Sequence, residues 1–187
     1  MKKDGVLKST REVRTFVDLA HGADVLIEKS VETAKGSYYT TMGALLLTAF
    51  TFEAYLNHLN KEIFKFCDEI EKLNVLPKYS VLCKHFGLTP DFSSRPYQTL
   101  ILLFRFRNAI AHGKSVIIQE TKAVDLSDTL PNWGAKAHWE EYSVLANAQR
   151  AKKDISQIIV ELHKVADLGD YPFMYGVASG SLGKKPE

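Results

Sequence analysis

The sequence predicts an all-α protein, an antiparallel up-and-down bundle of four to five helices with a short extended insertion before the last helix. Two observations support this fold class. Apolar residues recur over most of the chain at the three-and-four spacing of amphipathic helices. One segment, residues 96–113, is apolar on every side, as expected of a helix inside a bundle. At 187 residues the chain is predicted to be a single domain (1–187) with its helical core over about 10–166.

The composition is that of an ordinary globular protein, with 45% apolar and 25% charged residues. A net charge of +2 does not by itself predict nucleic-acid binding, so RNA contacts would require a local patch. Cys67 and Cys83 have no metal-ligand spacing around them and are interpreted as reduced, structural thiols. No apolar run reaches the roughly 20 residues that cross a bilayer, and the N-terminus lacks an apolar signal core. We therefore expect a soluble, cytoplasmic protein with no metal, no cofactor and no membrane partner.

The first half of the chain is predicted to form two long helices and one short one. The first begins at Ser9 or Thr10 and fades at about residue 35. The second covers about 38–72, with a possible break near Phe64. Pro77 interrupts the pattern, and a short helix follows over 78–86.

On the second helix, Glu53 and Asn57 lie one turn apart on the same face, beside apolar neighbours. Polar groups that flank an apolar stripe usually have a partner, because an unpaired buried group costs about 1–3 kcal/mol. Each of the two side chains is therefore expected to have a polar partner.

The insertion, residues 114–142, differs from the helices around it. Residues 115–121 are β-branched and predict a short strand or an extended arm, with a possible partner at 124–126. Residues 125–139 contain Pro, Asn and Gly and predict a long connection. Connections longer than about 12–15 residues tend to be functional or mobile.

The last long helix is expected to follow Ser143, a good N-cap residue. Its apolar stripe continues to about residue 165. Residues 1–9 are polar and expected to be loose, and the tail from 169 to 187 is expected to be irregular.

The helix predicted over residues 96–113 ends in polar side chains. It opens on a proline and closes on a glycine, which suit the first turn and the position just past a helix end. Near its end, Asn108 and His112 are four residues apart and share a face. Arg107 lies about 140° around the helix from His112, but its long side chain can turn toward the helix end. Histidine exchanges protons near neutral pH, as a general acid or base must.

This pattern resembles the signature of the HEPN domains, small helical bundles of which many are metal-independent ribonucleases in toxin–antitoxin, anti-phage and RNA-guided defence systems. Their signature is an arginine, commonly followed by Asn, His or Asp, and then a histidine, often at a helix end. Arg107, Asn108 and His112 match it in order and spacing. The phrase FEAYLN, residues 52–57, is also similar to the family. The resemblance covers about 10–166 and leaves the insertion unassigned.

The resemblance implies a metal-independent endoribonuclease, a toxin or phage-defence effector that cleaves RNA by attack of its own 2′-hydroxyl and leaves a 2′,3′-cyclic phosphate and a 5′-hydroxyl. His112 would be the general acid or base, and Arg107 would bind the phosphate as negative charge builds up. Asn108 would hold the phosphate or the histidine, and Glu53 would orient or pair with Arg107. The implied assembly is a homodimer whose two-fold axis brings together two copies of this helix end.

Three more residues are candidates for RNA binding, namely Arg105, Lys114 and Asn57. A solvated charge is the alternative for the first two. For Glu53 the alternative is a structural partner of an arginine in the core, which is the more common role of such a residue. The alternative function is a non-catalytic module of the same family that binds RNA, a nucleotide or a partner protein. An antitoxin or a nucleotidyltransferase would be such a partner.

Overall fold

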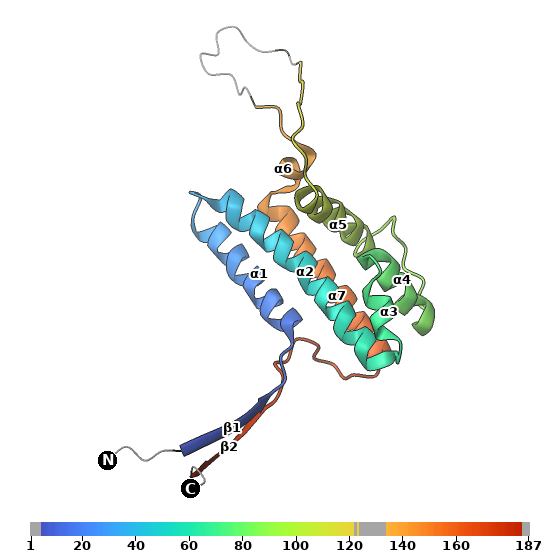
Figure 1. Ribbon diagram of the computed structural model, residues 1–187. Helices are drawn as coiled ribbons and strands as arrows, with labels where there is room; N and C mark the ends of the chain where they lie inside the picture. Colours follow the sequence, from blue (N-terminus) through green and yellow to red (C-terminus); the bar gives the residue numbers. More distant parts are fainter. Residues whose placement is uncertain (1–4, 122, 124–133, 185–187) are drawn as a thin grey trace, which may run out of the picture. The chain divides into compact units, whose positions relative to one another are not determined.

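The computed structural model describes residues 5–121, 123 and 134–184, and this part of the chain is mostly helical, with one two-stranded sheet (Figure 1). Over these ranges no helix is both long enough and apolar enough to cross a bilayer. The helices are α1 (Thr15–Glu32), α2 (Ser37–Ile63), α3 (Cys67–Glu71), α4 (Val75–Phe86), α5 (Tyr97–Ala111), α6 (His138–Tyr142) and α7 (Leu145–Val165), and the strands are β1 (Gly5–Arg11) and β2 (Ala178–Lys184).

The chain divides into two compact units. Unit 1 comprises residues 1–21, 50–89 and 159–187, and unit 2 comprises residues 22–49 and 90–158. Helices α1, α2 and α7 therefore contribute residues to both units.

In unit 2, α1 and α2 approach closely because small residues lie where they meet. A Cβ atom at Gly22 would lie 3.0 Å from the Leu47 side chain, and one at Gly43 would lie 3.0 Å from the Leu26 side chain. Side chains larger than hydrogen at these glycines would therefore push the helices apart. The buried apolar residues of unit 2 are Ala23, Ala44, Leu45, Ala49, Leu100, Leu103, Phe104, Phe106, Ala148, Ala151, Ile155 and Ile158.

Helix α5 follows its predicted boundaries closely, since Pro96 precedes it and His112 ends it. It buries mainly one face, formed by Thr99, Leu100, Leu103, Phe104 and Phe106. Ile101 and Leu102 are only half-buried, so the helix is less enclosed than its continuous apolar sequence predicts. The last turn is the most exposed part.

Unit 1 has an aromatic core. The Phe16 and Tyr55 rings meet edge to face with centroids 5.3 Å apart, which joins α1 to α2. The Phe52 and Tyr79 rings, 5.5 Å apart, join α2 to α4 in the same way. The hydroxyl oxygen of Tyr55 lies 3.2 Å from Nδ1 of His163, and this hydrogen bond connects α2 to α7.

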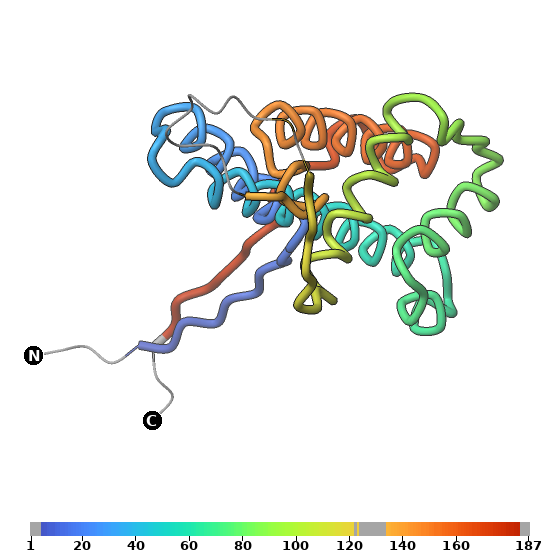
Figure 2. The backbone as a smooth tube through the Cα atoms, turned by 90° about the horizontal axis from the view of Figure 1, so that it is seen from above, coloured from blue at the N-terminus to red at the C-terminus, as the bar shows by residue number. Residues whose placement is uncertain are grey.

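The two ends of the described chain pair with each other. Strand β1 runs antiparallel to β2, with Gly5 opposite Lys184 and Arg11 opposite Ala178, and the two strands lie side by side in Figures 1 and 2. The expectations of a loose N-terminus, tested over residues 5–9, and of a first helix from Ser9 or Thr10 were therefore wrong. The tail forms a strand over residues 178–184, whereas residues 169–177 are irregular as expected. Helix α1 begins later, at Thr15. The fold is consequently not purely α.

The remaining boundaries agree in part with the sequence. The predicted break near Phe64 is confirmed, because α2 ends at Ile63 and α3 begins at Cys67. Helix α4 begins at Val75, before the predicted start, because Pro77 falls in its first turn, where a missing backbone N–H is tolerated.

The insertion and the start of the last helix also differ from expectation. Residues 115–121 form no strand and are exposed, and the possible partner at 124–126 lies outside the described residues. The predicted connection over 125–139 includes the first residues of α6. Ser143 ends α6 and donates a hydrogen bond from its hydroxyl to the Trp139 carbonyl oxygen at 2.9 Å.

Candidate functional site

The end of α5 carries three of the four residues of the predicted catalytic set, and the fourth, Glu53, lies on α2. The Arg107 side chain is half-buried, and its Nη1 donates a hydrogen bond to Oδ1 of the exposed Asn108 at 3.1 Å. His112 is exposed immediately after the helix, and its backbone N–H donates to the Asn108 carbonyl oxygen at 3.0 Å. A guanidinium, an amide and an imidazole are therefore held within the last turns of one helix.

The backbone ends the helix at this place for a steric reason. His112 leaves the helical conformation with φ −116° and ψ 18°. At Gly113, a Cβ atom would lie only 2.9 Å from the Ala109 carbonyl oxygen, closer than side-chain carbons normally approach backbone oxygen. The glycine therefore allows the chain to turn tightly over the helix end, and this turn leaves the imidazole of His112 in solvent.

Accessibility decides what this helix end can do chemically. A phosphate can reach His112 from solvent, and the half-buried Arg107 presents a guanidinium whose fork suits two phosphate oxygens. The hydrogen bond to Asn108 restricts the guanidinium to part of its rotamer range, so less entropy is lost when it binds an anion. The helix end can thus bind a phosphate and offer a titratable group beside it.

The candidates Arg105 and Lys114 lie near this end but differ in their surroundings. Arg105 is exposed and lines a small cavity of about 40 Å³ together with Phe106, Tyr142 and residues of α5 and α6. The Phe106 and Tyr142 rings are 5.4 Å apart, and burial raises the pKa of Tyr142 to about 12. Lys114 is exposed two residues after His112. Lys114 is therefore a sequence neighbour of His112, whereas Arg105 lies beside residues of α6.

Glu53 and Asn57 belong to unit 1, whereas the α5 end belongs to unit 2. The pairing of Glu53 with Arg107 stays a prediction. In unit 1, Asn57 Oδ1 accepts a short hydrogen bond from Nζ of Lys78, a lysine that is only 1% exposed. Burial lowers the pKa of Lys78, while Glu53 and Glu71 act in the opposite direction. The polar partner expected for this face of α2 is thus a lysine of α4.

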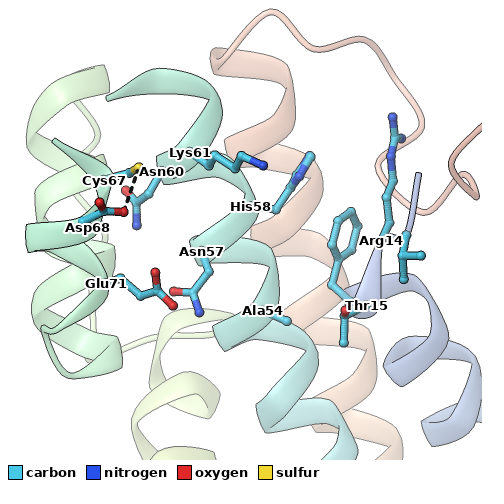
Figure 3. Close-up of a pocket in the computed structure, with 12 residues that line it drawn as sticks. Arg14, Thr15, Ala54, Asn57, His58, Asn60, Lys61, Cys67, Asp68 and Glu71 are labelled. Atoms are coloured by element: carbon cyan, nitrogen blue, oxygen red, sulfur yellow. Dashed lines mark hydrogen bonds between the residues drawn. The ribbon is translucent and has the colours of Figure 1, made fainter. Parts of the chain in front are cut away.

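A cavity of about 510 Å³ lies beside Asn57 in unit 1, and Figure 3 shows its lining from α1, α2 and α3. Lys61, His58 and Arg14 supply nitrogen groups, and Asp68 and Glu71 supply carboxylates. Burial lowers the pKa of His58, which therefore favours the neutral imidazole.

Asn60 also lines this cavity and is only 2% exposed. Neither its Nδ2 nor its Oδ1 has a hydrogen-bond partner among the described residues. A buried amide without a partner costs about 1–3 kcal/mol, so its position favours a site that a polar molecule completes. Sequence reasoning missed Asn60 and Lys78, because each looks like an ordinary polar residue of an amphipathic helix.

No family model, curated protein or solved structure matches the chain. Within residues 5–121, 123 and 134–184, no group of three or more His, Cys, Asp or Glu residues is arranged to hold a metal ion. Cys67 and Cys83 are free thiols, and burial raises the pKa of Cys83. Any proposal on function therefore rests on the residues of this chain.

Proposed function

We propose that the chain is a metal-independent endoribonuclease, a toxin or phage-defence effector built as a HEPN-like helical bundle. The observation that carries the proposal is the end of α5, where an exposed His112 follows a hydrogen-bonded Arg107 and Asn108. A structural role alone would not require a histidine and an arginine together at an accessible helix end, because either cation suffices to stabilise the helix dipole.

The reaction needs only groups of the chain and of the RNA. A general base removes the proton of the ribose 2′-hydroxyl, and the 2′-oxygen attacks the adjacent phosphorus. The bond from phosphorus to the 5′-oxygen breaks as a general acid gives that oxygen a proton. His112 supplies one of these proton-transfer groups, and the guanidinium of Arg107 stabilises the charge on the phosphate oxygens.

One chain supplies only one such histidine in its motif. We propose that a two-fold homodimer supplies the second, with the Arg107–His112 ends of two α5 helices facing each other across the cleft. A two-fold interface brings identical surfaces together, so one helix end per chain is sufficient to place both an acid and a base.

The second candidate is a non-catalytic module that binds RNA, a nucleotide or a partner protein such as an antitoxin or a nucleotidyltransferase. The cavity of unit 1 favours it, because the buried amide of Asn60 faces a space lined by groups of both charges. Retention of RNA without the formation of new ends would support this candidate over the nuclease.

The test is cleavage of a defined RNA in excess EDTA, followed by identification of the product ends. Wild-type protein is expected to give 2′,3′-cyclic phosphate and 5′-hydroxyl ends, and His112→Ala is expected to give none. His21→Ala removes an exposed histidine of unit 1 and is expected to cleave like wild type. Cleavage by His112→Ala at the wild-type rate would contradict the proposal.

A further inference from the structure

The β1–β2 ribbon has a composition unlike the rest of the chain. Strand β1 has the sequence GVLKSTR and β2 has ASGSLGK, so neither strand contains an acidic residue. Every residue of β1 is exposed, including Lys8 and Arg11. The whole chain mixes both signs of charge and sums to only +2, so the ribbon, which has no carboxylate, is a local positive element.

The pairing register places hydroxyl groups beside these cations. Lys8 lies opposite Ser181 and Thr10 lies opposite Ser179, and residues two apart in a strand share a face. One face of the ribbon therefore carries a lysine and three hydroxyls. The other face carries Ser9, Arg11 and the cross-strand pair of Leu7 and Leu182.

The base of the ribbon is attached to the start of α1. The Glu12 carboxylate accepts two hydrogen bonds from the Arg14 guanidinium, at 2.7 and 3.2 Å. Arg14 Nη1 also donates to the Met174 carbonyl oxygen at 3.4 Å, and the Glu12 N–H donates to the Val177 carbonyl oxygen at 3.0 Å. The ribbon is thus anchored at its base, while no helix covers its strands in Figure 1.

A ribbon of two strands is at best marginally stable in water, so a partner would be expected to order it. Its single cross-strand pair of leucines offers little apolar area for a protein interface. Lysine, arginine, serine and threonine side chains together with backbone N–H groups are the donors that contact nucleic-acid phosphates. The absence of carboxylates from both strands removes the main source of repulsion toward a polyanion.

We propose that the β1–β2 ribbon is an RNA-docking arm that RNA contacts along the β1 edge, where Lys8 on one face and Arg11 on the other bind backbone phosphates and the neighbouring hydroxyls add hydrogen bonds. The identity of the polyanion rests on the proposed ribonuclease function. Such contacts position RNA without reading its sequence, so the arm increases affinity for RNA of any sequence.

The test is the salt dependence of binding to a fluorescent single-stranded RNA, measured on the full chain in a His112→Ala background that prevents cleavage. Each phosphate contact contributes about 0.7 to the slope of log K against log salt concentration for single strands. Lys8→Ala/Arg11→Ala should therefore reduce the slope by about 1.4 and weaken binding at low salt by roughly tenfold or more. Lys35→Ala/Arg150→Ala removes the same two residue types from exposed positions elsewhere and should leave the slope near that of the parent.

An unchanged slope and affinity in Lys8→Ala/Arg11→Ala would overturn the proposal, as would an equal loss in the control. Binding of the ribbon to anionic lipid vesicles, lost in the same variant while RNA binding is kept, would assign the arm to a membrane surface instead. The result is separable from the nuclease proposal. Ribbon-dependent RNA binding by a protein that never cleaves RNA would support the docking arm and contradict the proposed catalytic function.

Discussion

The two ends of α5 use charged side chains in opposite ways. At its beginning, the Asp154 carboxylate is 3% exposed and accepts hydrogen bonds from Arg95 at 2.7 and 2.8 Å and from Thr99 at 2.6 Å. At its end, the half-buried Arg107 donates a hydrogen bond to its neighbour Asn108, and His112 is exposed to solvent. The Asp154 carboxylate is thus closed to a ligand, whereas His112 is accessible to one.

Burial and hydrogen bonding act in opposite directions on Asp154. Burial disfavours its ionised form, but the hydrogen bonds from Arg95 and Thr99 outweigh burial, so the pKa of Asp154 lies below its usual value. A carboxylate with a lowered pKa in the folded state stabilises the fold above its unfolded pKa of about 4 and loses this contribution as the pH falls through the folded value. The hydrogen-bonded Asp154 carboxylate at the beginning of α5 thus stabilises the fold at neutral pH.

The largest stability effect should come from Arg95→Ala. The substitution removes two hydrogen bonds from the buried Asp154 carboxylate and leaves it the Thr99 hydroxyl and the nearby charge of Arg150. The free energy of unfolding should therefore fall by clearly more than the roughly 0.5 kcal/mol of a surface substitution. Chemical denaturation at pH 7 measures the change, and the added substitution Asp154→Asn should restore part of it. The exposed control Lys35→Ala should change the free energy of unfolding by less than about 0.5 kcal/mol. A loss below that level in Arg95→Ala would remove the contrast between the two helix ends.

Arg107→Lys should affect catalysis at the other end. Lysine keeps the positive charge but lacks the planar fork, so the rate of RNA cleavage should fall roughly 100-fold, as for the loss of one transition-state donor. The single-turnover rate in EDTA is the measurement, and Arg150→Lys is the matched control. Cleavage at the wild-type rate would show that the guanidinium is not used in the transition state.

The stability of the fold should depend on pH through the buried His163. Burial lowers the pKa of His163, with a further contribution from nearby His58. Below about pH 6.5 the unfolded chain then binds more protons at this residue than the folded chain does, so stability falls as the pH decreases. Thermal unfolding midpoints from pH 7.5 to 5 should fall less steeply in His163→Gln than in wild type. Equal slopes in His163→Gln and wild type would contradict this assignment.

The smallest effect should come from the base of the ribbon. A Cβ atom at Gly176 would lie 2.5 Å from the Glu12 carbonyl oxygen, so Gly176→Ala must displace the backbone there. Amide hydrogen exchange in β1 should become faster in this variant. Gly183→Ala, whose Cβ atom would meet nothing within 4 Å, is the control within the same segment and should exchange like wild type. Unchanged exchange in Gly176→Ala would show that this contact does not hold the ribbon.

The sequence predicted elements whose signals are local. The limits of α5 followed from a proline and a glycine, and the break near Phe64 followed from the change in pattern after Ile63. The candidate motif Arg107, Asn108 and His112 was also readable, because its residues lie within one helical turn and a half of each other.

The missed features depend on contacts between distant residues. Strand β2 is rich in glycine and serine, and its partner lies at the other end of the chain, so no alternating apolar pattern marks it. The burial of Lys78 was not readable from the sequence, because its partner Asn57 lies 21 residues earlier. The burial of Asp154 was not readable either, because Arg95 precedes it by 59 residues.

The most direct test of the account is the single-turnover rate of RNA cleavage in EDTA by His112→Ala protein whose unfolding midpoint matches wild type. We expect that rate to fall by a factor of roughly 100 to 10,000, the usual contribution of a general acid or base. A folded variant that cleaves as fast as wild type would contradict the assignment of the α5 end as the catalytic site.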